Sequence, residues 1–123
     1  MRGIIGVLQE LRYSGEESSG GGMAVYLSAS EETGAVTITV TGRFQSIDHM
    51  DFLSAYESIA QLDTPLTLDL SSTVYLDSAA LGMLLAMREH FGGDKAKISI
   101  VGCNDQIKRI LNIAHFSRLF DIP

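Results

Sequence analysis

The chain has 123 residues, of which 46% are hydrophobic and 20% charged, a composition typical of a single globular domain. Nine basic and fifteen acidic side chains give a formal net charge of -6, and no cluster of Lys or Arg interrupts this acidity, which argues against direct binding to nucleic acid or anionic membranes. No apolar stretch approaches the roughly 18 to 20 residues of a membrane span, and the N-terminus does not resemble a signal peptide, so we expect a cytoplasmic protein.

Residues 1–22 are expected to form a flexible N-terminal extension or linker. They join a short amphipathic piece, "IIGVLQELR", to "YSGEESSGGG", which has the Gly-, Ser- and Glu-rich composition of linkers. Met23 follows three glycines directly and is a candidate for the natural start of the chain. The folded domain is predicted to span residues 23–123.

The domain is predicted to begin with an antiparallel hairpin. Residues 23–30, "MAVYLSAS", and 35–42, "AVTITVTG", are rich in β-branched and aromatic residues, and the second segment alternates between apolar residues and Thr. "EETG" between them supplies the turn.

A helix is predicted over residues 46–62. Apolar residues recur near the helical period from Ile47 and Met50 onwards, and Ser46 is placed to cap the helix. "LTLDL" at 66–70 is nearly continuous in apolar character and predicts a buried central strand, with "SSTVYLD" as the loop that follows it.

The C-terminal half predicts helix, strand and helix. A helix from Ser78 to about Phe91 is stopped by two glycines, "KISIVG" predicts a buried strand, and "NDQIKRILNIAHF" a third helix. Because alternating strands and helices require parallel crossovers, we expect an α/β domain with a small mixed four-stranded sheet. The sheet is predicted to be parallel in its centre with an antiparallel edge hairpin, and its helices to lie mainly on one face.

The sequence "YLDSAALGML" at residues 75–84 carries the main functional signal. Asp77 and Ser78 are residues with which helices ordinarily begin, so a capping role is the simplest interpretation. A nucleophile is disfavoured because Ser78 lacks the Gly-x-Ser-x-Gly surroundings of a hydrolase elbow. The third interpretation is that Ser78 accepts a phosphoryl group, which a helix N-terminus can accommodate.

Catalytic, metal-binding and nucleotide-binding signals are weak. His49, His90 and His115 do not have the spacing of metal ligands, and no Gly-rich phosphate loop occurs. The single cysteine, Cys103, excludes an internal disulfide and is interpreted as a small buried residue at a strand end. We therefore expect neither an enzyme nor a bound cofactor or metal.

The helix after Ser78 is a candidate docking surface. Ala79, Gly82, Met83 and Ala86 share one stripe, where small side chains would let another protein approach closely. The alternative is that this stripe packs on the sheet, and the burial of Met83 distinguishes the two.

With these residues assembled, residues 23–122 resemble a STAS domain of the anti-sigma factor antagonist family. The resemblance lies in "LTLDLSSTVYLDSAALGMLLAMREHF", in "VTGRF" and in "ISIVGCNDQIKRILNIAHFSRLFDI". It implies that Ser78 is the phosphoacceptor, although Ala79 and Ala80 replace residues frequent in the family motif. It also implies that Asp69 and Asp77 shape loops or recognise a partner, unless both merely cap backbone donors. Arg43 and Phe44 would lie near the partner surface.

The resemblance further implies partner switching. The unphosphorylated protein would bind an anti-sigma factor that is also a Ser/Thr kinase, phosphorylation of Ser78 would release it, and a PP2C-type phosphatase would restore it. An alternative is a constitutive STAS adaptor of an ABC-type lipid transporter, in which Ser78 stays unmodified. A nucleotide- or lipid-sensing domain is a third, weaker alternative.

Overall fold

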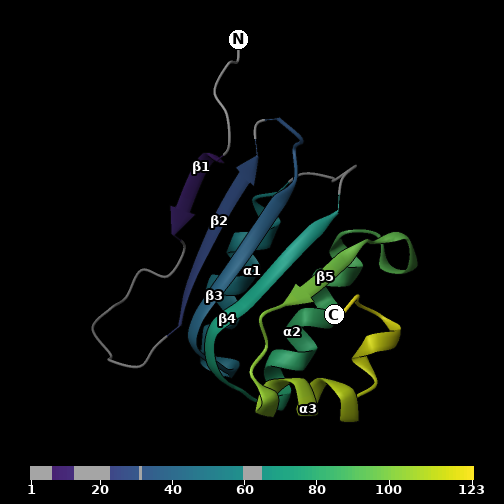
Figure 1. Ribbon diagram of the computed structural model, residues 1–123. Helices are drawn as coiled ribbons and strands as arrows, with labels where there is room; N and C mark the ends of the chain where they lie inside the picture. The colour runs from purple at the N-terminus through teal and green to yellow at the C-terminus, as the bar shows by residue number, and fades with distance from the viewer. Residues whose placement is uncertain (1–6, 13–22, 31, 60–64) are drawn as a thin grey trace.

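The computed structural model describes residues 7–12, 23–30, 32–59 and 65–123. They form one five-stranded sheet with three α-helices (Figure 1). The strands are β1 (Val7–Arg12), β2 (Ala24–Ser30), β3 (Val36–Phe44), β4 (Leu66–Leu76) and β5 (Ile98–Val101). The α-helices are α1 (His49–Glu57), α2 (Ser78–His90) and α3 (Asp105–Ile113), and the short 3-10 helices are η1 (Ser46–Asp48), η2 (Gly93–Lys95) and η3 (Phe116–Arg118).

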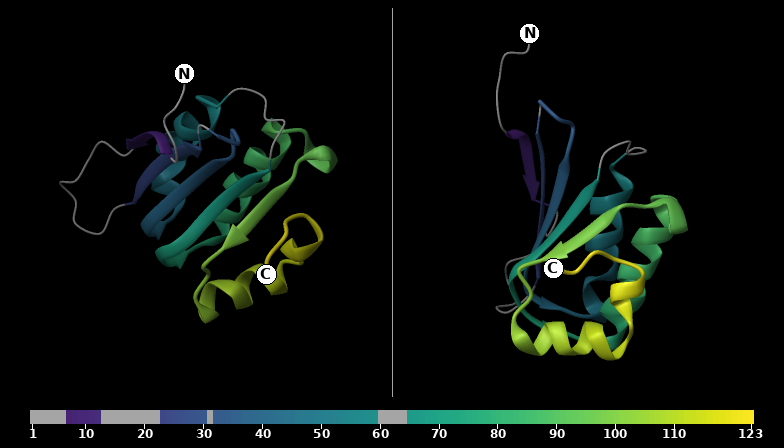
Figure 2. Two further views of the ribbon diagram at one scale, coloured as in Figure 1. Left: turned by 45° about the horizontal axis from the view of Figure 1, so that its top comes forward. Right: turned by 45° about the vertical axis from the view of Figure 1, so that its right-hand side comes forward.

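The strand order along the sheet is β1-β2-β3-β4-β5. β2 pairs antiparallel with both β1 and β3, whereas β3, β4 and β5 pair in parallel. The predicted mixed α/β class, parallel centre and antiparallel edge are thus confirmed. In the right-hand view of Figure 2, α1 and α2 lie on one side of the sheet, also as predicted.

The structure corrects the predicted count of four strands. The fifth strand, β1, comes from the segment that we predicted to be flexible, and it pairs with β2. The amphipathic pattern of this segment fits a helix as well as a strand, and its pairing partner was not evident from local sequence. Residues 1–6 and 13–22 lie outside the described residues, so the predicted domain boundary at Met23 stays a prediction.

The core lies between the sheet and the helices. Alternate residues of β2, β3 and β4 point toward the helices because successive strand side chains face opposite sides. The largest fully buried side chains come from all layers: Val25, Ile38, Leu66, Leu68, Leu70 and Ile100 from the sheet, and Phe52, Leu84, Met87, Ile107 and Leu111 from the helices. Phe116 and Phe120 are also buried, so the last segment packs back onto the core.

β4 is longer than predicted, because the "SSTVYLD" segment continues the strand to Leu76 instead of forming a loop. Two register shifts accommodate this length, one between Thr39 and Thr41 of β3 and one between Gly42 and Arg43. At the first shift Val40 is skipped in the pairing of β3 with β4, and the buried Thr73 hydroxyl of β4 donates a hydrogen bond of 2.7 Å to the Val40 carbonyl. The irregular ladder therefore keeps its buried polar groups satisfied while it carries both strands to the start of α2.

Candidate functional site

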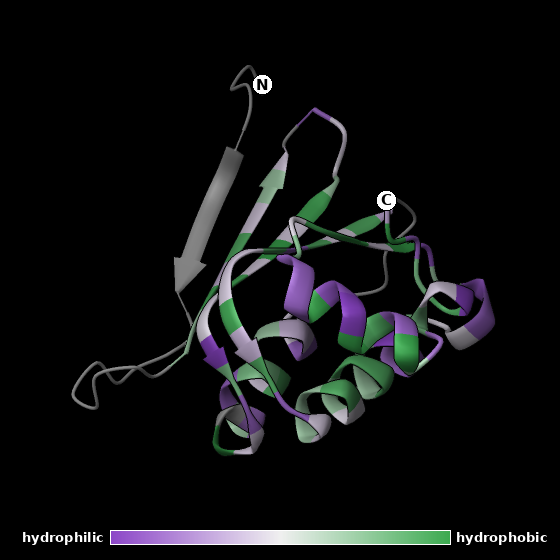
Figure 3. Cartoon of the chain, turned by 60° about the horizontal axis from the view of Figure 1, so that its bottom comes forward, coloured by the Kyte–Doolittle hydropathy of each residue, from purple (hydrophilic) through white to green (hydrophobic). Residues whose placement is uncertain are grey.

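Asp77 connects the end of the sheet to helix α2. Its side-chain Oδ1 accepts a hydrogen bond of 2.9 Å from the Ala80 N–H, and its backbone is extended, with φ -107° and ψ 179°. Its own N–H donates to the Phe44 carbonyl at 3.3 Å. Asp77 is therefore the N-cap of α2, and it also ties the ends of β3 and β4 together. In Figure 3 these two strand ends come forward and lead into η1 and α2.

Ser78 is the first residue of α2 and is exposed. Because Asp77 supplies the cap, the Ser78 hydroxyl is not needed for it, and it forms no hydrogen bond with any residue that the structure describes. The structure thus separates two roles that the sequence left combined. Asp77 stabilises the helix start, whereas the Ser78 hydroxyl is available to another molecule.

The stripe predicted on α2 is only partly exposed. Ala79, Gly82 and Ala86 face solvent, but Met83 is 6% exposed and belongs to the core. The assignment of Met83 to a partner surface is therefore corrected. The buried side of α2 consists of Ala80, Met83, Leu84 and Met87. Leu85 lies on the opposite side of the helix and is 38% exposed.

Gly82 leaves an open position in the exposed stripe. A β-carbon built at this residue would have no neighbouring atom within 4 Å. Packing within the described chain therefore does not require glycine here, and a side chain at this position would project into the space that a docking protein would occupy. We call the exposed residues Ser78, Ala79, Gly82 and Ala86 the α2 stripe.

Arg43 and Phe44 take opposite environments at the end of β3. Arg43 is exposed, and its guanidinium lies 4.3 Å from the centre of the Tyr75 ring. Phe44 is fully buried, with its ring centre 4.9 Å from that of Phe52. The prediction that Phe44 lies at the partner surface is wrong, because strand alternation turns its side chain toward the helices.

Three exposed apolar residues that the sequence did not single out lie near the same strand ends. Ile47, Met50 and Val74 are 83%, 64% and 60% exposed. Each lies within six residues along the chain of Phe44 or Asp77, whose backbones are hydrogen-bonded. Ile47 and Met50 contributed to the apolar periodicity that predicted the helix, and this periodicity does not indicate which of its residues stay exposed.

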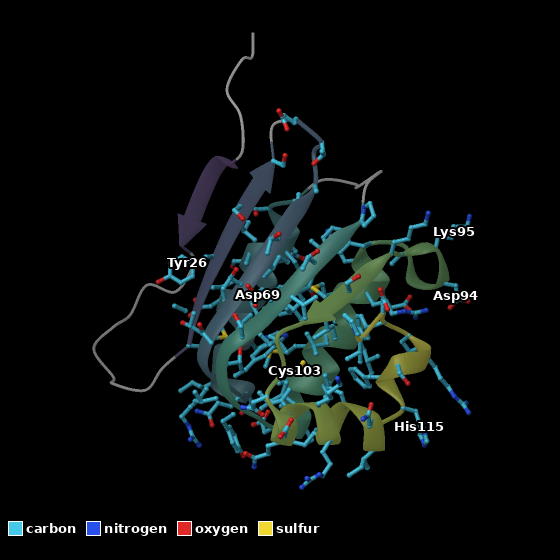
Figure 4. The ribbon with its side chains drawn as sticks, in the orientation of Figure 1. Tyr26, Asp69, Asp94, Lys95, Cys103 and His115 are labelled. Carbon is cyan, nitrogen blue, oxygen red and sulfur yellow. The ribbon has the colours of Figure 1, made fainter. Side chains whose placement is uncertain are left out.

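Asp69 lies away from Ser78. It is half-buried in the middle of β4, on the sheet face opposite the helices, and its Oδ1 accepts a hydrogen bond of 2.9 Å from the Ser71 N–H (Figure 4). Leu76, the last residue of β4, lies seven positions further along the strand, about 23 Å away in extended backbone. The structure therefore does not bring Asp69 together with the α2 stripe, and it shows the side chain capping a backbone donor.

The remaining chemistry-bearing side chains lie elsewhere. His90 is at the far end of α2 and packs its ring against Phe91 and Tyr56, while His115 follows α3. Burial raises the pKa of the half-buried Cys103 thiol, which disfavours the reactive thiolate. Within the described ranges, no group of three His, Cys, Asp or Glu side chains could hold a metal ion. Nor does any helix in the described parts of the chain have the length and apolar character to cross a membrane.

Comparison with known proteins gives three results. A family model described as "Mlab, STAS domain" matches residues 27–121. A protein of Pseudomonas aeruginosa (strain UCBPP-PA14), described as STAS-domain containing, is 42% identical over 100 residues, which are 81% of this chain and 99% of the relative. The crystal structure of an anti-sigma factor antagonist from Mycobacterium paratuberculosis superposes with a TM-score of 0.66 over 86% of this chain and 89% of that one. The sequence identity to it is 16%, so this likeness concerns the fold.

Proposed function

The chain belongs to the STAS domain family, and from this premise we propose that it is an anti-sigma factor antagonist in a partner-switching cascade. In this proposal the unphosphorylated protein binds an anti-sigma factor that is also a Ser/Thr kinase, in the cytoplasm of a bacterium. The kinase phosphorylates Ser78 and the complex separates. A PP2C-type phosphatase then restores the binding form, and the protein itself catalyses no reaction.

The exposed Ser78 hydroxyl at the start of α2 is the observation that carries the proposal. Since Asp77 already caps the helix, a phosphoryl group on Ser78 would displace no hydrogen bond within the described chain. It would add about -1.5 to -2 charges at neutral pH, directly beside the Asp77 carboxyl. The modification would therefore change the surface that a partner meets while leaving the fold intact.

The surroundings of Ser78 support a protein partner. The α2 stripe offers small side chains, and Ile47, Met50 and Val74 supply exposed apolar surface near the same strand ends. Apolar side chains with this exposure commonly mark contact surfaces when they gather in one region. We propose that Asp77, Arg43 and these apolar residues border the docking site.

Phosphorylation of Ser78 is the direct test. The full-length protein is incubated with ATP and the candidate anti-sigma kinase, and the phosphorylated peptide is mapped by mass spectrometry. We expect one phosphate on Ser78 and none on the Ser78→Ala variant. Phosphate on another residue, or none in a complex that forms with an active kinase, would contradict the proposed switch.

The alternative function is a constitutive adaptor of an ABC-type lipid transporter, which would use the same surface without modification. The description of the matched family model names Mlab and no antagonist, so this alternative is retained. The mapping experiment separates the two, because a constitutive adaptor binds its partner with Ser78 unmodified throughout.

Enlarging Gly82 should separate stability from binding. Gly82→Ala is expected to stabilise the protein by up to about 1 kcal/mol, because alanine favours an exposed helix and meets no neighbour here. Gly82→Gln, which extends further from the helix, is expected to weaken binding of the anti-sigma factor at least about tenfold, or about 1.4 kcal/mol, by obstructing close approach. Urea unfolding and calorimetric titration measure the two effects. Unchanged affinity of Gly82→Gln would remove Gly82 from the docking site.

A further inference from the structure

The sequence of β2 is that of an interior strand. Residues 24–30, "AVYLSAS", contain neither a charged residue nor Pro, the two features that natural edge strands use to prevent pairing with other chains. Val25 and Leu27 are buried on the helix side of the sheet. Without β1, however, β2 would be the outermost strand of the sheet.

β1 supplies the protection that β2 lacks. It is the outer strand in Figure 1, and it pairs with β2 continuously from Gln9 to Arg12. Its sequence contains the charged residues Glu10 and Arg12, whereas β2 contains none. β1 also lies outside residues 27–121, the region that matches the family model.

The opposite edge of the sheet is covered differently. The Ile100 N–H donates to the Asp121 carbonyl at 2.8 Å, and the Asp121 N–H donates to the Ile98 carbonyl at 2.9 Å. This covering segment is anchored by the buried Phe120 beside Asp121. β5 is therefore covered by a segment fixed in the core, whereas β2 is covered by a separate strand at the N-terminal side.

We propose that the outer edge of β2 is a strand-pairing site for a second copy of this chain, and that β1 blocks this site in the monomer. When β1 is displaced, β2 strands of two copies pair antiparallel about a two-fold axis near Leu27, and one continuous sheet spans both copies. Antiparallel pairing of identical strands is self-complementary, so each copy offers the same surface. β2 contains no charged residue, which favours a second copy of the chain as the pairing partner. Two β2 strands that meet at the two-fold axis would bring no like charges together. The inference is independent of the function proposed for Ser78.

The test uses the full-length protein with substitutions in β1 that prevent it from pairing with β2. Three consecutive prolines, introduced as Gln9→Pro, Glu10→Pro and Leu11→Pro, remove the N–H groups over the centre of β1 and cannot form a strand ladder. We expect wild type to be monomeric and the triple-proline variant to be dimeric by sedimentation equilibrium. The variant loses Glu10, so its formal net charge is -5 instead of the -6 of wild type; this charge opposes association, and the dimer fraction should rise with salt.

Two further variants make the result specific. Replacing the same three residues by Ala retains every N–H and should leave the protein monomeric. Adding Ser28→Lys to the triple-proline variant places like charges beside the two-fold axis and should restore the monomer. If the triple-proline variant fails to fold, three glycines at the same positions weaken pairing less severely and should give a measurable dimer fraction. A folded monomer in either the proline or the glycine variant, or a dimer insensitive to Ser28→Lys, would overturn the proposal.

Discussion

Ser78→Asp is expected to reduce affinity for the anti-sigma factor more than about a hundredfold, while Ser78→Ala retains nearly the affinity of wild type. The aspartate places a fixed negative charge next to the Asp77 carboxyl at the start of α2. Within a docked interface both charges would be partly removed from water and would repel each other, and a cost of about 3 kcal/mol corresponds to this loss. Calorimetric titration of both variants against the purified partner measures the effect.

The control is Ser117→Asp, which adds the same charge at an exposed position of η3. η3 lies beside the C-terminal end of α2, where Arg88 donates to the Leu119 carbonyl at 3.3 Å, and Arg88 is about 15 Å along the helix from Ser78. This variant should bind like wild type, because screening weakens the influence of distant surface charges. All three variants should have similar unfolding midpoints, since Ser78 makes no hydrogen bond within the described structure. Wild-type affinity in Ser78→Asp would exclude the proposed switch.

Phe44→Ala is expected to lower the free energy of unfolding by about 3 to 5 kcal/mol. The Phe44 side chain is fully buried and its ring contacts that of Phe52, so its removal leaves a cavity between the sheet and α1. Losses of this size approach the whole stability of many single domains. Urea denaturation followed by circular dichroism provides the measurement, and Phe44→Leu, which fills most of the volume, should lose much less.

The neighbouring residue provides the comparison. Arg43→Ala removes an exposed cation–π contact with Tyr75 and should cost no more than about 1 kcal/mol. Its expected effect is instead on partner binding, because its side chain is exposed beside the strand ends. If Phe44→Ala had the same urea midpoint of unfolding as wild type, Phe44 could not be a buried core residue. Its predicted place at the partner surface would then be restored.

The sequence alone was sufficient to predict most of the elements and their order. The alternation in residues 36–41 and the continuous apolar run of residues 66–70 predicted strands because side-chain periodicity follows from backbone geometry. The two glycines after residue 91 likewise predicted the end of α2. These signals are local, and the resemblance carried by residues 76–82 is local as well.

The environment of individual side chains depended on the tertiary structure. Met83 and Phe44 were predicted at the partner surface but are buried, and Ile47 and Met50, with which the helical pattern begins, are exposed. A periodic pattern indicates that one face of an element is apolar, but a rotation of one residue changes which side chains meet the sheet. Only the packing of α2 and β3 against their neighbours decides this.

The sequence by itself determined that this chain is an α/β domain with a helix that begins at an acidic residue followed by serine. It did not determine which of the two oxygen-bearing side chains caps that helix, or that the β2 edge acquires a fifth strand. Capping depends on the dihedral angles of Asp77, which the hydrogen bond to Phe44 helps to hold, and strand pairing joins segments whose local sequences do not specify one another. Both features arise from contacts between parts of the chain that are brought together only when the sheet is assembled.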